Sequence, residues 1–141
     1  MATRSTIALE YADGTVDQIY CHWDGYIEHN GQILERDYKD PFKVQKLMDL
    51  GDLSALGSEI GEKQDFDDHT TQDDDWCLFY ARDRGEWNVD ARRFSNYEDY
   101  LENRQREEFD YILQTDGVWR VSIHGNEFVE LANAVRMTEI V

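Results

Sequence analysis

Residues 4–23, RSTIALEYADGTVDQIYCHW, decide the fold. Apolar and polar residues alternate on both sides of an Asp-Gly pair at 13–14, and Ile7, Leu9 and Tyr11 share one face of the first run. Alternation with a period of two is typical of a half-buried strand. Asp-Gly favours a tight turn, because both residue types tolerate positive φ. The stretch therefore predicts an antiparallel hairpin.

The length of this turn sets the register of the hairpin. A two-residue turn would place Glu10 opposite Asp17, and two like charges directly across a strand pair are unfavourable. A three-residue turn with Gly14 at positive φ instead pairs Ile7 with Ile19. We favour the three-residue turn.

Two further segments also predict hairpins, although their flanking residues do not match those of the first well enough to indicate a repeat. Residues 76–94, WCLFYARDRGEWNVDARRF, predict a hairpin that turns near Arg84-Gly85. Residues 108–124, EFDYILQTDGVWRVSIH, predict another that turns at Asp116-Gly117.

Helical signals lie between and after the hairpins. Asp40-Pro41 predicts the start of a helix that ends at Gly51, and Ser95 with Glu98 forms a capping-box pattern. Helical spacing also predicts a short helix over 29–38, one helical turn over 52–61 and a closing helix over 126–135. We therefore expect a single α+β domain over 1–141, with a mostly antiparallel sheet of three hairpins and helices packed on one face.

The overall charge limits the partners. The chain has 141 residues and a formal net charge of −17, with an isoelectric point near 4.4. Such a surface repels nucleic-acid phosphates and anionic membranes, so we expect no direct nucleic-acid or membrane partner and favour basic proteins. The beginning of the sequence lacks a long apolar run, which favours a cytoplasmic protein. Cys21 and Cys77 lie in apolar segments and are expected to be buried free thiols.

The charge is densest in residues 59–75, EIGEKQDFDDHTTQDDD, where eight residues are acidic and one is Lys. A calcium loop is disfavoured, because the stretch has neither a central glycine nor a correctly spaced closing glutamate. A solvated loop or flap and a surface that binds a basic partner both remain. Residues 98–110 are also acidic, and a face shared with 59–75 would create a broad negative field that imitates nucleic acid. The candidate partner-binding residues are Asp65, Asp67, Asp68, Asp73, Asp74, Asp75, Glu107 and Glu108.

A second hypothesis rests on arginines that lie among aromatic residues. Arginine and aromatic side chains together can bind the phosphates and bases of nucleotides, which predicts a module that sequesters a nucleotide-type signal. The candidate ligand-binding residues are Arg82, Arg84, Arg92, Arg93, Trp23 and Trp87. The competing interpretation is local pairing of the arginines with Asp83, Glu86 and Asp90.

No motif in the sequence indicates catalysis. The chain has no phosphate-binding glycine loop, nucleophile elbow or zinc-ligand spacing. Cys21 and His22 are adjacent on a predicted strand, so their side chains point to opposite faces and cannot act as a catalytic pair. We therefore expect a non-enzymatic protein without a metal or cofactor.

The segments RSTIALEYADGTVDQIYCHWDGY (4–26) and LMDLGDLSALG (47–57) resemble a family of small accessory proteins encoded by bacteriophages and prophages. The resemblance covers roughly the first 57 residues and assigns no role to any residue. It implies expression in the cytoplasm of a host bacterium. By analogy with other small acidic phage proteins, it also implies inhibition of a host defence or nucleic-acid-handling protein, as anti-CRISPR proteins do. A third hypothesis, a minor structural or assembly protein of the virion, predicts a homo-oligomer.

Overall fold

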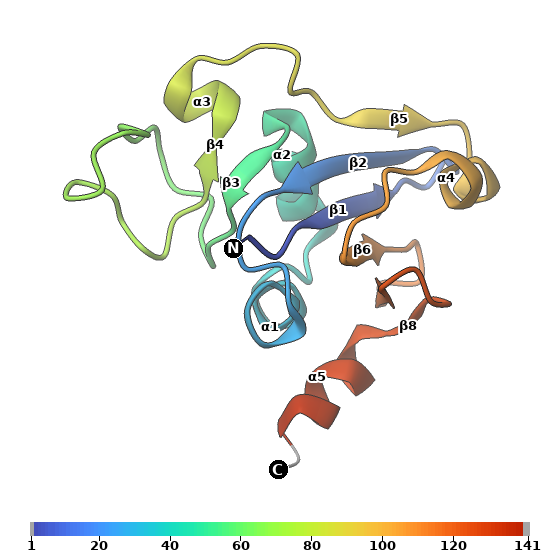
Figure 1. Cartoon of the computed structure of the whole chain (residues 1–141). Helices are drawn as coiled ribbons and strands as arrows, with labels where there is room; N and C mark the ends of the chain where they lie inside the picture. The colour runs from blue at the N-terminus through green and yellow to red at the C-terminus, as the bar shows by residue number, and fades with distance from the viewer. Residues whose placement is uncertain (1, 140–141) are drawn as a thin grey trace.

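One mixed sheet organises residues 2–139, the part of the chain that the computed structural model describes (Figure 1). Its eight strands are β1 (Ser5–Glu10), β2 (Val16–Cys21), β3 (Leu53–Ala55), β4 (Leu78–Phe79), β5 (Arg92–Phe94), β6 (Phe109–Leu113), β7 (Trp119–Ile123) and β8 (Val129–Glu130). The strand order is β4-β3-β2-β1-β6-β7-β8, with β5 paired to β2. The helices within these residues are α1 (Gln32–Asp37), α2 (Pro41–Leu50), α3 (Tyr80–Arg84), α4 (Tyr97–Asn103) and α5 (Leu131–Glu139), and a π-helical turn, η1 (Ile27–Gly31), precedes α1. The predicted α+β class is confirmed.

The first and third predicted hairpins are present. β1 and β2 pair antiparallel with Ile7 opposite Ile19, as the three-residue turn requires. Gly14 adopts φ 92° and its N–H donates to the carbonyl of Tyr11. β6 and β7 form the other hairpin, with Leu113 opposite Trp119. In both hairpins the Asp-Gly pair determined the turn.

The prediction of a mostly antiparallel sheet built from three hairpins is wrong in two respects. First, β1 pairs with β6 in parallel, with Ile7 opposite Tyr111, and β2 pairs with β3 in parallel. Second, residues 76–94 do not form a hairpin. β4 pairs with β3, α3 follows immediately, and β5 pairs with β2 instead of β4. Gly85, which was predicted at the hairpin turn, ends α3 in the left-handed conformation at φ 73°.

The helix signals gave mixed results. Helix α2 begins as predicted, because the Asp40 side chain accepts a hydrogen bond from the N–H of Phe42 and Pro41 takes the first helical position. The predicted helical turn over 52–61 is wrong, since Leu53 is extended in β3 and pairs with Cys21 and Phe79.

Two helix starts were misplaced. Helix α4 is capped by Asn96, one residue after the predicted Ser95, because Asn96 accepts from the N–H of Asp99. The closing helix begins at Leu131, since the preceding residues pair with β7 as β8.

Helices cover both faces of the sheet, which corrects the expected one-sided packing. Ile7 and Leu9 point into a core that receives side chains from α1, α2 and α5. Ala8, which points to the opposite face, packs in a smaller core with Tyr100 of α4. No helix among residues 2–139 is long and apolar enough to cross a bilayer.

Candidate functional site

The acidic loop, residues 59–75, joins β3 to β4 and has no helix or extended strand pairing. It extends away from the sheet in Figure 1. One isolated β-bridge pairs Glu59, the first residue of the loop, with Trp76, which directly follows its last residue. Gly61 adopts φ 70°, and a Cβ at this position would collide with the ring of Trp76. The ends of the loop are therefore closed tightly against each other.

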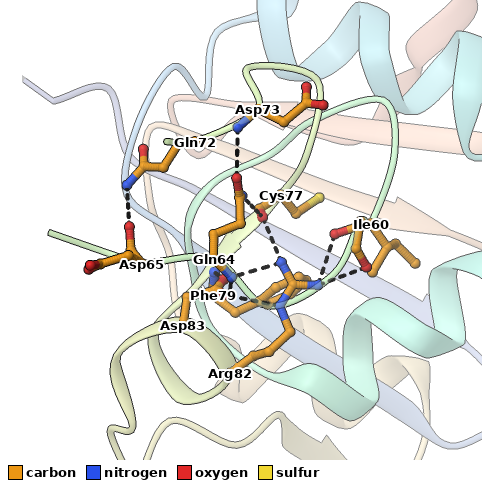
Figure 2. Close-up of polar contacts among 10 residues, drawn as sticks. Ile60, Gln64, Asp65, Gln72, Asp73, Cys77, Phe79, Arg82 and Asp83 are labelled. Atoms are coloured by element: carbon orange, nitrogen blue, oxygen red, sulfur yellow. Dashed lines mark hydrogen bonds and ion pairs between the residues drawn. The ribbon is translucent and has the colours of Figure 1, made fainter. Parts of the chain in front are cut away.

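Three polar side chains, Gln64, Arg82 and Asp83, hold the base of the loop (Figure 2). We call them the Gln64 cluster. The Arg82 guanidinium donates from Nη1 to the carbonyls of Ile60 (2.9 Å) and Gly61 (3.1 Å), and from Nη2 to that of Cys77 (2.9 Å). Its Nε donates to the buried Asp83 carboxylate at 3.0 Å. All three nitrogens of this guanidinium thus have partners.

Asp83 and Gln64 connect the guanidinium to the rest of the loop. Asp83 accepts from the N–H groups of Gln64 (2.8 Å) and Phe79 (2.6 Å). The buried Gln64 side chain accepts from the N–H of Asp73 at 2.7 Å and donates to the carbonyl of Cys77 at 3.2 Å. The cluster therefore fixes backbone on both sides of the acidic segment.

Further contacts order the outer part of the loop. The Gln72 side chain donates to the carbonyls of Asp65 (2.9 Å) and Phe66 (3.0 Å). The Phe66 ring lies 5.5 Å from that of Tyr80, and the Arg84 guanidinium lies 4.4 Å above the Phe66 ring. Because these contacts join the loop to α3, the structure favours an ordered loop over a free flap.

The six aspartates predicted in this loop divide into two groups. Asp65, Asp68 and Asp73 each accept from the backbone N–H two residues later, so they shape the turns of the loop. The Thr70 hydroxyl, which also donates to Asp68, lowers the pKa of that carboxyl below its ordinary value.

The second group consists of Asp67, Asp74 and Asp75. These side chains are exposed and accept no hydrogen bond from any described residue. Their carboxylates are therefore free to contact a partner.

The other two predicted residues lie outside the loop. Glu107 and Glu108 belong to the connection between α4 and β6, where Glu107 is half-buried and accepts from the Gln105 side chain at 2.8 Å. Helix α4 itself lies at the opposite end of the sheet from the acidic loop (Figure 1). The structure thus gathers six of the eight candidates in one loop and does not bring α4 to that loop.

The four candidate arginines do not converge on a cavity. Arg82 pairs with Asp83, and Arg84 pairs with Glu86. Both pairings match the local interpretation of the sequence.

The other two arginines have partners that the sequence did not indicate. Arg92 binds Asp52 through two hydrogen bonds of 2.9 and 3.0 Å. Arg93 binds Asp17 through two of 2.9 Å, so neither arginine pairs with the expected Asp90. The candidate tryptophans are exposed, Trp23 by 43% and Trp87 by 82%, and neither lines any of the four main hollows found among the described residues. This arrangement offers no guanidinium free for a nucleotide phosphate.

Cys21 and Cys77 are buried and free, as predicted. Burial raises the pKa of Cys21 to about 12, so this thiol is inert near neutral pH. Within residues 2–139, no three His, Cys, Asp or Glu side chains are grouped closely enough to hold a metal ion.

Comparisons with known proteins give no relative. No protein-family model, curated protein or solved structure matches the chain. The site must therefore be interpreted from its own chemistry.

Sequence patterns indicated the exposed carboxylates but missed the residues that position them. Gln64 was missed because a single glutamine in an acidic stretch has no distinctive spacing. Asp83 was treated only as a counter-ion of an arginine. A usable signal existed, since an Arg82-Asp83 pair directly after the apolar segment 77–81 indicates a buried ion pair.

Proposed function

We propose that this chain is a non-enzymatic accessory protein that binds a basic, nucleic-acid-binding host protein through the acidic loop and blocks it by imitating nucleic acid. The proposal includes a role in the cytoplasm of a phage-infected bacterium, as the resemblance implies. The observation that carries it is an ordered loop with outward carboxylates, braced by a buried polar cluster.

Bracing matters because association is opposed by the entropy of ordering both surfaces. A loop that is already fixed loses less conformational freedom on binding than a mobile acidic tail does. No described residue pairs with the carboxylates of Asp67, Asp74 and Asp75, so their negative charge is available to basic side chains of a partner. These features support a preformed binding surface over charge that serves only solubility.

The net charge supports the same partner class. At −17, the protein attracts cationic surfaces over distances of about one Debye length, roughly 8–10 Å at physiological salt. A groove that binds nucleic acid is such a surface. The expected contact forms rapidly, weakens as salt rises and competes with DNA or RNA for the groove.

The first experiment is a pull-down from bacterial lysate with the intact protein as bait, followed by mass spectrometry. We expect a stoichiometric nucleic-acid-binding protein that raised salt releases and that added duplex DNA displaces. A retained protein that DNA does not displace would contradict nucleic-acid mimicry.

The second experiment locates the surface with two matched variants. The triple change Asp67→Lys, Asp74→Lys and Asp75→Lys should weaken binding of the captured protein at least about tenfold, about 1.4 kcal/mol. The control carries Glu28→Lys, Asp90→Lys and Glu102→Lys, which alter net charge equally at exposed sites outside the loop. Equal weakening in both variants would show that overall charge, and not this loop, carries binding.

A further inference from the structure

A second buried polar cluster lies on the face of the sheet that α4 covers. It consists of Gln18, Arg104 and Asp110, and we call it the Gln18 cluster. The side chains of Arg104 and Asp110 are 3% and 0% exposed, and Nη1 of the arginine donates to Oδ2 of the aspartate. Asp110 also accepts from the Thr6 hydroxyl at 2.6 Å. The arginine is thus held rigidly by its carboxylate partner.

Two polar atoms beside this ion pair have no hydrogen-bond partner. They are Nε of Arg104 and the hydroxyl of Tyr100, and they are the buried side-chain nitrogen and oxygen atoms of residues 2–139 that lack one. Buried polar groups in folded proteins are nearly always paired, because an unpaired one has lost its hydration without replacement. Two such atoms, from residues one helical turn apart at the C-terminal end of α4, therefore mark a place where a partner is missing.

Arg104 lines a hollow of about 410 Å³ between α4 and the turn that precedes β8. Its guanidinium carbon lies 5.1 Å from the centre of the Phe128 ring and 5.9 Å from that of Tyr100. The remaining lining residues are Tyr97, Leu101, Arg106, Gly125, Asn126, Glu127 and Phe128. The hollow thus combines apolar and aromatic walls with two guanidinium groups.

Arg106 differs from most arginines of this chain. It is exposed, donates from Nη2 to the carbonyl of Leu101 at 2.9 Å and forms no ion pair with any described residue. By contrast, Arg82, Arg92 and Arg93 are all paired with carboxylates. Arg106 therefore offers a guanidinium without a paired carboxylate at the same hollow as the buried Arg104, and the one carboxylate on that lining belongs to the exposed Glu127.

We propose that this hollow binds a small anion whose charged group, a carboxylate or a phosphate, is carried on a planar apolar ring. The guanidinium of Arg106 would contact the charged group at the rim, while Arg104 fixes the inner end of the site. Guanidinium groups match the oxygens of carboxylate and phosphate in a planar, two-bond geometry. Tyr97 and Phe128 would contact the ring, and the volume lies within the range of roughly 300–1,000 Å³ found for small-molecule sites. The site is independent of the acidic loop and of the proposed function.

The test is a titration of the intact protein with benzoate, phenyl phosphate, inorganic phosphate and benzyl alcohol, followed by calorimetry and by NMR shifts of the Tyr97 and Phe128 rings. We expect at least one aromatic anion to bind, with benzyl alcohol and inorganic phosphate at least tenfold weaker. Stronger binding of benzoate would indicate a carboxylate ligand, and stronger binding of phenyl phosphate a phosphate ligand. Failure of both aromatic anions to bind at millimolar concentration would overturn the proposal.

A pair of arginine variants locates the site. Arg106→Gln removes the rim charge without touching the buried ion pair, and should weaken binding of the better probe at least tenfold. Arg136→Gln removes another exposed arginine, on α5, that does not line the hollow, and should leave binding unchanged. Equal affinity of the Arg106→Gln variant and the unchanged protein would overturn the proposal, as would equal weakening by both variants.

Discussion

The Gln64 cluster and the Gln18 cluster are built from the same three residue types but complete their hydrogen bonds to different extents. In each, a buried glutamine holds backbone with both ends of its amide. Gln64 binds the carbonyl of Cys77 and the N–H of Asp73, whereas Gln18 binds the carbonyl and N–H of Gln105.

The arginines of the two clusters show the difference. Every nitrogen of the Arg82 guanidinium donates to the chain, while Nε of Arg104 donates to nothing. A cluster whose polar atoms all have partners has no hydrogen bond left to offer a ligand, so we assign the Gln64 cluster a structural role. The Gln18 cluster lies beside a hollow and keeps one polar atom, Nε of Arg104, without a partner.

The largest expected effect comes from removing the carboxylate of the Gln64 cluster. Asp83→Ala would leave Arg82 without its counter-ion and the N–H groups of Gln64 and Phe79 without their acceptor. Breaking a buried ion pair in this way should lower the free energy of unfolding by about 3–5 kcal/mol, which urea denaturation measures. The control is Glu86→Ala, which breaks a surface pair with Arg84 whose side chains are 43% and 37% exposed, and should change the unfolding midpoint far less. Similar effects of the two variants would show that burial does not distinguish the Gln64 cluster from a surface pair.

A smaller effect is expected from the two glutamines. Gln64→Ala and Gln18→Ala should each cost about 1–3 kcal/mol, because each leaves buried polar groups without a partner. The two variants should differ in where the chain opens. We expect an endoproteinase specific for Asp to cut the acidic loop faster in Gln64→Ala and not in Gln18→Ala. Equal cleavage rates would mean that the Gln64 cluster does not hold the loop.

The smallest effect separates two buried tyrosine hydroxyls. Tyr38→Phe removes a 2.7 Å hydrogen bond to the carbonyl of Gly57 and should cost about 1 kcal/mol. Tyr100→Phe removes a hydroxyl that has no partner, so stability should stay unchanged or rise by up to about 1 kcal/mol. Thermal unfolding of both variants checks the contrast. If Tyr100→Phe destabilises the protein as much as Tyr38→Phe does, the Tyr100 hydroxyl has a hydrogen-bond partner in solution.

Local signals in the sequence predicted local structure. The Asp-Gly pairs at 13–14 and 116–117 determine two hairpins, and Asp40-Pro41 starts α2, because each acts through neighbours in the chain. Residues 76–94 failed because their pairing is decided elsewhere. β4 and β5 have two and three residues, and their extended form depends on β3 and β2, which no local pattern encodes.

The same limit applies to the two clusters. The density of acidic residues in 59–75 was enough to predict a loop with exposed aspartates such as Asp67 and Asp74. The network that braces the loop needs Gln64 and Asp83 to meet across 19 positions, and Gln18 reaches Gln105 across 87. Pairings of this length are set by the sheet, so only the fold could reveal them.

The parallel pairing of β1 with β6 has a consequence for the order in which the protein can be made. Thr6 and Asp110, bonded side by side in the sheet, are 104 positions apart. While the chain is still on the ribosome, β1 can pair with β2 but its other edge stays open until residues 109–113 have emerged. An open edge can pair with the wrong strand, so the nascent chain is exposed to misassembly for most of its synthesis. We therefore expect folding to finish only after translation is nearly complete. The final step should take roughly milliseconds to seconds, which is the folding time typical of long-range strand pairing.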